Sequence, residues 1–176
     1  MTDTTALQKT NSASETVSVS IRMPETRDGK HIYRLVKHSK VLDLNSEYLY
    51  LLIGTHFKHT SCVVEVDGTL SGFVSAYVRP DQPDALFVWQ IAVDETQRKR
   101  GFALAMLKDI IKRSYCAPIE YLQASIAPSN YPSRALFIAL AHDLAADYDE
   151  QPLFQSNHFS DDHESEPLVI IGPLSK

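Results

Sequence analysis

The sequence predicts an α/β (α+β) fold in which helices flank a mixed, mostly antiparallel β-sheet. The first reason is a hairpin pattern. Two apolar runs, residues 62–66 and residues 70 to about 78, lie on either side of Asp67-Gly68, a dipeptide that favours the tight turn of a β-hairpin. Because so short a connection joins only antiparallel neighbours, the two runs predict an antiparallel pair in the sheet.

The second reason is a strand–helix–strand pattern in the middle of the chain. Residues 86–93 are nearly continuous in apolar side chains, which indicates a strand buried on both faces. Residues 101 to about 115 repeat apolar side chains at helical spacing, and residues 121–126 form another strand pattern. Two strands joined through a helix predict a parallel pair with a right-handed crossover, so the sheet is mixed.

The remaining elements complete the order of the fold. Asn45 or Ser46 can cap a helix that starts at Glu47. The other expected elements are a strand at 17–21, helices at 28–39, 47–57 and 132–142, and one or two strands at the C-terminus, including 168–171. Residues 1–15 are polar and are predicted to be disordered, which leaves residues 16–176 as one domain.

Length and composition exclude several classes of function. Seventeen Lys and Arg residues against 22 Asp and Glu residues give the 176-residue chain a net charge of −5, whereas a nucleic-acid-binding protein needs a basic face. No apolar run reaches the roughly 18–20 residues that span a bilayer, and the polar N-terminus is unlike a secretory signal. Cys62 and Cys116 form no CxxC pair, so we expect neither a disulfide nor a metal site. The expected location is the cytoplasm, with no nucleic-acid or membrane partner.

The loop after the buried strand has the character of an anion site. Residues 89–103 read WQIAVDETQRKRGFA, so a strand runs into a basic loop that ends at the start of a helix. Exposed N–H groups at a helix start and the positive end of the helix dipole attract anions. Gly101 allows close backbone approach, and Arg98, Lys99 and Arg100 add positive charge. The pattern predicts a pyrophosphate site, although a Lys/Arg run before a helix is also typical of a solvated loop.

The segment Arg98-Lys-Arg-Gly101-Phe-Ala103 resembles the R/Q-x-x-G-x-G/A signature of the GNAT superfamily, and the order of elements from residue 17 to residue 171 is similar to the whole GNAT domain. The resemblance implies that acetyl-CoA is the cosubstrate and that this loop binds its pyrophosphate. It also implies that the preceding strand hydrogen-bonds the pantetheine arm and helps to hold the acetyl carbonyl. The residues implied in coenzyme binding are Gln90, Ile91, Ala92, Val93, Arg98, Lys99, Arg100, Gly101, Phe102, Ala103, Asn130 and Ser133.

The helix that follows residue 130 departs from the family in one respect. The family places an Asn at the position of Asn130 to contact the coenzyme, whereas Asn130 and Ser133 are equally suited to cap the helix. The family often places a Tyr in this helix to protonate the leaving thiolate, and Phe137 stands at that position here. Because Phe has no proton to donate, the general acid is absent, supplied by another residue, or unnecessary.

Three separate stretches resemble the diaminobutyrate acetyltransferases, the acetylating enzymes of ectoine synthesis. These are residues 42–52 with His56-Phe57, residues 87–93 and residues 163–168. The resemblance implies transfer of acetyl to the 4-amino group of L-2,4-diaminobutyrate, a small diamine with one carboxylate, by an enzyme that forms homodimers. The residues implied in binding this substrate are Asp43, Tyr48, Trp89, His163 and Glu166.

The reaction needs a base, because an alkyl ammonium has a pKa near roughly 10.4 and must lose a proton before it attacks. Glu166 is the first expected catalytic residue and His163 is the second. Structural alternatives stay open: Asp43 as a helix cap, Trp89 as plain core, and the acidic stretch 161–166 as a solvated loop. Two other functions also stay open, namely a GNAT enzyme for another small cationic amine and a non-catalytic acyl-CoA-binding module.

Overall fold

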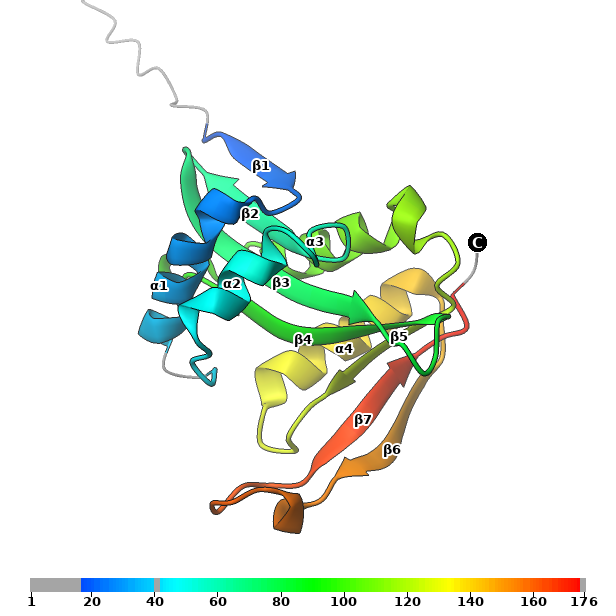
Figure 1. Ribbon diagram of the computed structural model, residues 1–176. Coiled ribbons are helices and arrows are strands. Elements are labelled where there is room, and N and C mark those ends of the chain that lie inside the picture. The colour runs from blue at the N-terminus through cyan, green and yellow to red at the C-terminus, as the bar shows by residue number, and fades with distance from the viewer. Residues whose placement is uncertain (1–16, 40–41, 175–176) are drawn as a thin grey trace, which may run out of the picture.

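The computed structural model describes residues 17–39 and 42–174. These residues form a seven-stranded sheet in the order β1-β2-β3-β4-β5-β7-β6 (Figure 1). The strands are β1 (Val19–Arg22), β2 (Cys62–Val66), β3 (Thr69–Val78), β4 (Ala85–Val93), β5 (Tyr121–Ser125), β6 (Tyr148–Phe154) and β7 (Glu166–Ile171). Neighbours are antiparallel except β4 and β5, which are parallel. The predicted mixed, mostly antiparallel sheet is therefore confirmed, and so is the parallel pair.

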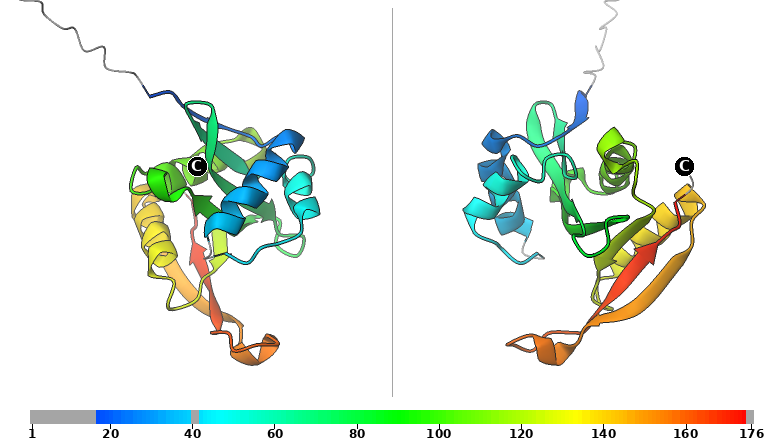
Figure 2. Two further views of the ribbon diagram at one scale, coloured as in Figure 1. Left: turned by 90° about the vertical axis from the view of Figure 1, so that its left-hand side faces the viewer. Right: turned by 45° about the vertical axis from the view of Figure 1, so that its right-hand side comes forward.

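Helices cover both faces of the sheet. The helices α1 (Gly29–Ser39) and α2 (Glu47–Ile53) lie on one face, and α3 (Phe102–Ile111) and α4 (Tyr131–Leu144) lie on the other (Figure 2). Each face has its own buried apolar cluster, one around Tyr50 and Phe73 and one around Met106, Leu107 and Phe137. No helix within the described ranges is long and apolar enough to cross a lipid bilayer.

Several elements differ from the expected ones at their ends. Helix α2 stops at Ile53 and not at residue 57, with Gly54 as its C-cap residue. Gly54 packs so closely on the turn before α1 that a Cβ there would lie 2.3 Å from the Glu25 carbonyl oxygen, so this position requires a glycine. Helix α3 ends at Ile111, and a short 3-10 turn at Ser114–Cys116 follows it. Strand β6 leaves most of its side chains exposed, so it shows no apolar alternation in the sequence. The predicted disordered segment, residues 1–15, lies outside the described residues.

Candidate active site

Strands β4 and β5 part after a short stretch of pairing. Their parallel register covers only Ala85–Phe87 against Tyr121–Gln123, whereas β4 stays paired with β3 up to Val93. The N–H of Gln90 donates to Ser75 Oγ at 3.2 Å and the N–H of Asp94 donates to Ser71 O at 2.8 Å, so both point towards β3. Backbone groups alternate in direction along a strand, and those of Ile91 therefore point to the side where β5 has parted. A strand edge of this kind offers hydrogen bonds to an extended ligand.

A β-bulge interrupts β4 at Trp89. Ser75 lies opposite Gln90 while Ala76 lies opposite Val88, so Trp89 is the extra residue. A bulge re-aims side chains, and here two consecutive ones lie on the α2 side of the sheet. Trp89 lines a small pocket together with Ile53 and Phe57, and Gln90 hydrogen-bonds the Tyr50 hydroxyl and the Asp43 carbonyl. Trp89 remains 47% exposed, so the expected burial of this strand on both faces is wrong at that position.

Gln90 joins β4 to the segment that precedes α2. Its side chain is buried, and its Nε2 donates a 2.9 Å hydrogen bond to the backbone carbonyl of Asp43. The Tyr50 hydroxyl is also buried; it donates to Gln90 Oε1 at 3.5 Å and accepts from the N–H of Asn45 at 3.4 Å. Burial raises the pKa of Tyr50, so this hydroxyl keeps its proton. The network holds the backbone that carries Asp43 against the strand that carries Trp89.

The Asp43 carboxylate and the Tyr48 side chain are both open to solvent. The carboxylate of Asp43 makes no hydrogen bond or ion pair within the part of the chain that the structure describes. Ser46, and not Asp43, is the N-cap residue of α2, so the alternative role of Asp43 as a helix cap is not what the structure shows. Tyr48 lies in the first turn of α2 and is 68% exposed. Both side chains are therefore accessible to a ligand.

The loop from β4 to α3 presents a row of free donors. Lys99 and Gly101 adopt left-handed backbone conformations, with φ angles of 62° and 78°, and Gly101 is the N-cap residue of α3. The first helical bond that reaches the loop runs from Ala105 N–H to Gly101 O at 3.0 Å, and the N–H groups of residues 99–104 have no acceptor among the described residues. Nothing lies within 4 Å of the point where a Gly101 Cβ would stand. Exposed donors at the positive end of a helix dipole form a site for an anion.

The basic side chains of this loop are exposed, as they would be in a solvated loop. Arg98 Nε donates to the carbonyl of Val93 at 3.3 Å, which ties the loop back to the end of β4. The Arg100 guanidinium hydrogen-bonds Gln97 and lies 4.8 Å from the centre of the Phe102 ring. The other positions implied in coenzyme binding lie on either side of this loop. Ile91, Ala92 and Val93 are in the last part of β4, and Phe102 and Ala103 are in the first turn of α3.

Asn130 is the N-cap residue of α4. Its Oδ1 accepts a 3.2 Å hydrogen bond from the N–H of Ser133, so the structure shows the helix-cap arrangement for this pair. Phe137 lies on α4, is 2% exposed and belongs to the core cluster that also contains the buried residues of α3. The position where the family often has a Tyr is therefore a core position in this protein.

His163 and Glu166 lie together at the end of the loop between β6 and β7. His163 Nε2 is 3.7 Å from Glu166 Oε1, and the His163 ring stacks on Phe159 with centroids 3.9 Å apart. His163 Nδ1 lies 2.7 Å from the carbonyl oxygen of Glu164. A carbonyl only accepts, so Nδ1 carries the proton of this contact, and Nε2 is the ring nitrogen turned towards Glu166.

This pair is attached to the C-terminal end of β5. The Glu164 carboxylate accepts from the N–H of Ser129, in the loop before α4, at 3.1 Å, and the Pro167 carbonyl accepts from the N–H of Ile126 at 3.2 Å. The structure thus forms two groups of the expected substrate residues. Asp43 and Trp89 meet through Gln90, and His163 meets Glu166. Within the described ranges no hydrogen bond, ion pair or ring contact joins the two groups.

The cysteines offer no nucleophile for a covalent acyl intermediate. Both are buried and unpaired. Burial raises the pKa of Cys62 to about 12 and raises that of Cys116 as well, so both thiols stay protonated near neutral pH. The geometry therefore suits direct transfer between two bound molecules, one of them extended along a strand edge with an anionic group at the start of α3.

Comparison with known proteins agrees with a group-transfer enzyme of this kind. The profile of the Acetyltransferase (GNAT) family matches residues 29–140. The L-2,4-diaminobutyric acid acetyltransferase of Nocardia farcinica is 41% identical over 156 residues, 89% of this chain and 81% of its own length, and that of Bordetella parapertussis is 42% identical over 157 residues, 88% and 84%. A diaminobutyrate acetyltransferase from Paenibacillus lautus, solved with L-2,4-diaminobutyric acid and coenzyme A, matches with a TM-score of 0.88 and 36% identity over 92% of this chain and 98% of that one. The chain therefore belongs to the GNAT acetyltransferase family and, within it, to the diaminobutyric acid acetyltransferases.

Proposed function

We propose that this protein transfers the acetyl group of acetyl-CoA to the 4-amino group of L-2,4-diaminobutyrate, a step of ectoine biosynthesis. The observation that carries the proposal is the likeness to proteins named for this reaction, which extends over 88–92% of the chain. The solved relative holds both diaminobutyric acid and coenzyme A, the two molecules that this reaction requires.

The coenzyme is proposed to lie along the edge of β4 with its pyrophosphate at the start of α3. The free N–H groups of residues 99–104 supply donors for phosphate oxygens, and Arg98, Lys99 and Arg100 add positive charge. The N–H and C=O of Ile91 point away from β3, which supports the proposal that they bond the pantetheine arm or the acetyl carbonyl. Asn130 uses its Oδ1 to cap α4, so a coenzyme contact from its side chain would come from Nδ2.

The amine is proposed to bind between the two groups of substrate residues. Asp43 and Glu166 supply negative charge for the two ammonium groups, and the exposed face of Trp89 can hold a cation. His163 Nε2 lies 3.7 Å from a carboxylate oxygen of Glu166, and in the neutral imidazole with its proton on Nδ1 both atoms are acceptors. An ammonium carries three N–H donors, so a single one can satisfy both acceptors at once.

The proposed reaction needs one base and no covalent enzyme intermediate. Glu166, or His163 beside it, takes a proton from the bound ammonium, and the free amine attacks the thioester carbonyl carbon. In this proposal the backbone N–H of Ile91 on β4 stabilises the oxyanion of the tetrahedral intermediate. The C–S bond then breaks and coenzyme A leaves as the thiolate. The nitrogen of the new amide loses its second proton, which reaches the thiolate through water. A water path is proposed because Phe137, at the position where the family often has a Tyr, has no proton to donate.

A homodimer in the cytoplasm completes the proposal. Strand β6 is an edge of the sheet with most of its side chains exposed, and an edge strand presents backbone groups that a second chain can pair. The two cysteines are unpaired, as is usual in a reducing compartment. Light scattering coupled to size-exclusion chromatography tests the dimer; a mass equal to one chain at micromolar concentration contradicts it.

The substrate is tested by thiol release from acetyl-CoA against a panel of amines. The panel contains 2,4-diaminobutyrate, ornithine, lysine, spermidine and an aminoglycoside. A strong preference in kcat/KM for diaminobutyrate supports the proposal. Turnover that favours another amine makes the chain a GNAT enzyme of different specificity, and coenzyme A binding without any turnover makes it a non-catalytic binding module.

A further inference from the structure

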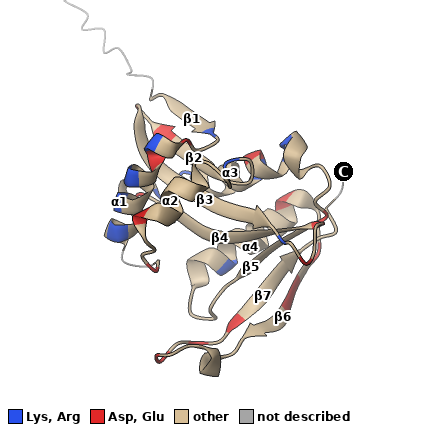
Figure 3. Ribbon diagram, viewed as in Figure 1, with Lys and Arg blue, Asp and Glu red and all other residues tan. Residues whose placement is uncertain are grey.

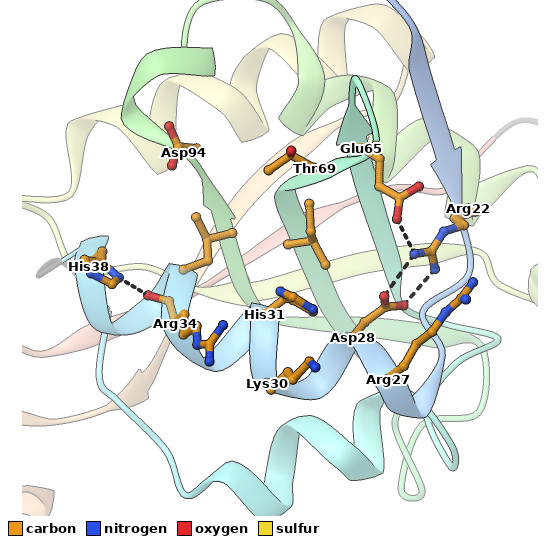
Figure 4. A pocket seen from close by; sticks show the side chains of 13 residues that line it. Arg22, Arg27, Asp28, Lys30, His31, Arg34, His38, Glu65, Thr69 and Asp94 are labelled. Atoms are coloured by element: carbon orange, nitrogen blue, oxygen red, sulfur yellow. Dashed lines mark hydrogen bonds and ion pairs between the residues drawn. The ribbon is translucent and has the colours of Figure 1, made fainter.

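A basic cavity lies on the α1 side of the sheet, apart from the free edge of β4. Lys and Arg residues gather on α1 (Figure 3). Between this helix and the β2–β3 hairpin is a cavity of about 620 Å³, a size usual for small-molecule sites (Figure 4). Leu35 and Leu70 contribute apolar wall, and Thr69 contributes a hydroxyl group.

One face of α1 and of the turn before it lines this cavity with basic side chains. They are Arg27, Lys30, His31, Arg34 and His38, which follow each other at spacings of one, three or four residues. Positions three and four apart lie on the same side of a helix, so these side chains form one stripe that faces the hairpin. Figure 4 shows Lys30, His31 and Arg34 on the helix, with Glu65 and Thr69 on the strands across from them.

The carboxylates around the cavity are already occupied by other partners. Arg22 binds Asp28 through two hydrogen bonds of 2.7 and 2.9 Å and binds Glu65 through a third of 2.5 Å. Asp94 accepts from the N–H and the hydroxyl of Thr96 at 3.0 and 2.6 Å. Each of these carboxylates keeps its negative charge, but among the described residues none of them forms an ion pair with Lys30 or Arg34.

Two cations of the stripe have no partner of their own. Among the described residues, neither the Lys30 ammonium nor the Arg34 guanidinium makes an ion pair or hydrogen bond, whereas Arg27 pairs with Glu25 at 2.8 Å. Lys30 and Arg34 lie four positions apart on the helix and both line a partly apolar cavity, so two positive charges without ion-pair partners stand close together there. Such a pair of charges favours an anion, even in a chain of net charge −5. The sign of this charge also separates the cavity from the site proposed for the cationic amine.

We propose that this cavity binds a small molecule that carries two or more anionic phosphate or carboxylate groups. Lys30 supplies a compact charge and Arg34 a planar fork of donors, which together suit two oxyanion groups of one ligand. Asp94 lies at the rim of the cavity and also begins the loop that leads to the start of α3. The proposal stands independently of the amine substrate.

Calorimetric titration of the full-length enzyme tests this site. Inorganic pyrophosphate and citrate are titrated separately, at a fixed ionic strength of about 0.15 M and with saturating coenzyme A so that the loop before α3 is filled. We expect saturable binding of one molecule per chain for at least one of the two. Pyrophosphate alone would assign a phosphate ligand, and citrate alone a carboxylate ligand.

The double substitution Lys30→Gln with Arg34→Gln should weaken that binding by at least about tenfold, because each lost charge-assisted hydrogen bond is worth roughly that factor or more. The matched control is Lys37→Gln with Lys112→Gln, which removes the same charge from positions outside the cavity and should leave the affinity unchanged. All four side chains are exposed or half-buried, and thermal unfolding checks that both variants fold. Absence of binding to the coenzyme-saturated enzyme, or equal weakening in both double variants, overturns the proposal.

Discussion

Replacing Gln90 by Met separates two roles for this residue. Resemblance to the family assigns Gln90 to the coenzyme, whereas the structure buries its side chain and directs it to the Asp43 carbonyl at 2.9 Å and the Tyr50 hydroxyl at 3.5 Å. Met keeps a similar volume and removes both hydrogen bonds. If Gln90 has this structural role, the variant no longer holds the segment that carries Asp43 against β4, whereas its coenzyme site is unchanged.

The magnitude follows from the groups that lose partners. One neutral hydrogen bond contributes about 0.5–1.5 kcal/mol, and a buried polar group left without a good partner costs about 1–3 kcal/mol. The free energy of unfolding should therefore fall by about 2 kcal/mol, and the Tm by about 4–8 °C for a domain of this size. A displaced Asp43 should raise the KM for diaminobutyrate by about tenfold, which corresponds to about 1.4 kcal/mol.

Steady-state kinetics with each substrate varied in turn, together with calorimetric melting, gives the readout. Tyr50→Phe is the matched control, because it leaves the 2.9 Å bond between Gln90 and Asp43 intact and should lose about 1 kcal/mol of stability with a near-normal KM for the amine. A Gln90→Met variant with raised KM for acetyl-CoA and unchanged KM for diaminobutyrate would refute the reasoning and show that Gln90 binds the coenzyme.

Three further predictions concern the loop, the base and the acid stability. Gly101→Ala should raise the KM for acetyl-CoA and leave that for the amine unchanged, because a Cβ at a φ of 78° costs about 1–2 kcal/mol of backbone strain in the loop that carries the free donors; an unchanged KM for acetyl-CoA contradicts the anion site. Glu166→Gln should lower kcat by about 10²–10⁴-fold if this carboxylate is the base, and wild-type kcat at saturating amine across the pH range excludes it. Burial alone raises the pKa of Asp28, but its hydrogen bonds with Arg22 and the Glu25 N–H hold it below the ordinary value of 3.8, so the stability from this pair is present above pH 3.8 and is lost as the pH falls through the lowered pKa. Arg22→Met should therefore cost about 2–3 kcal/mol at pH 7, and the cost should shrink as the pH falls below 3.8 and through the lowered pKa of Asp28. Urea unfolding across this acid range can measure it, and a cost that stays constant until the protein unfolds contradicts the pairing.

The parts of the fold that follow from local sequence could be predicted. Asp67 and Gly68 have φ angles of 48° and 74°, which is the reason that this dipeptide marks the hairpin turn. The loop before α3 was also readable, because its Gly and its basic residues are consecutive. His163 and Glu166 are close in space because they are close in sequence.

What depends on contacts across the sheet could not be predicted. The bulge at Trp89 exists only in the register of β4 against β3, and nothing in the run of apolar residues marks it. Gln90 and Asp43 are 47 positions apart, so their hydrogen bond is invisible until the sheet is built. The buried Tyr50 was the one available signal, since a Tyr at a core position of a helix needs a polar partner for its hydroxyl.

The most direct test of the central claim is the structure of the product. The enzyme is incubated with acetyl-CoA and L-2,4-diaminobutyrate, and the acetylated product is identified by two-dimensional NMR. We predict that the new amide proton correlates with the C4 methylene protons and that the C2 proton keeps the shift of a free α-amine. Acetylation at the 2-amino group, or no acetylated product while coenzyme A still binds, would contradict the claim.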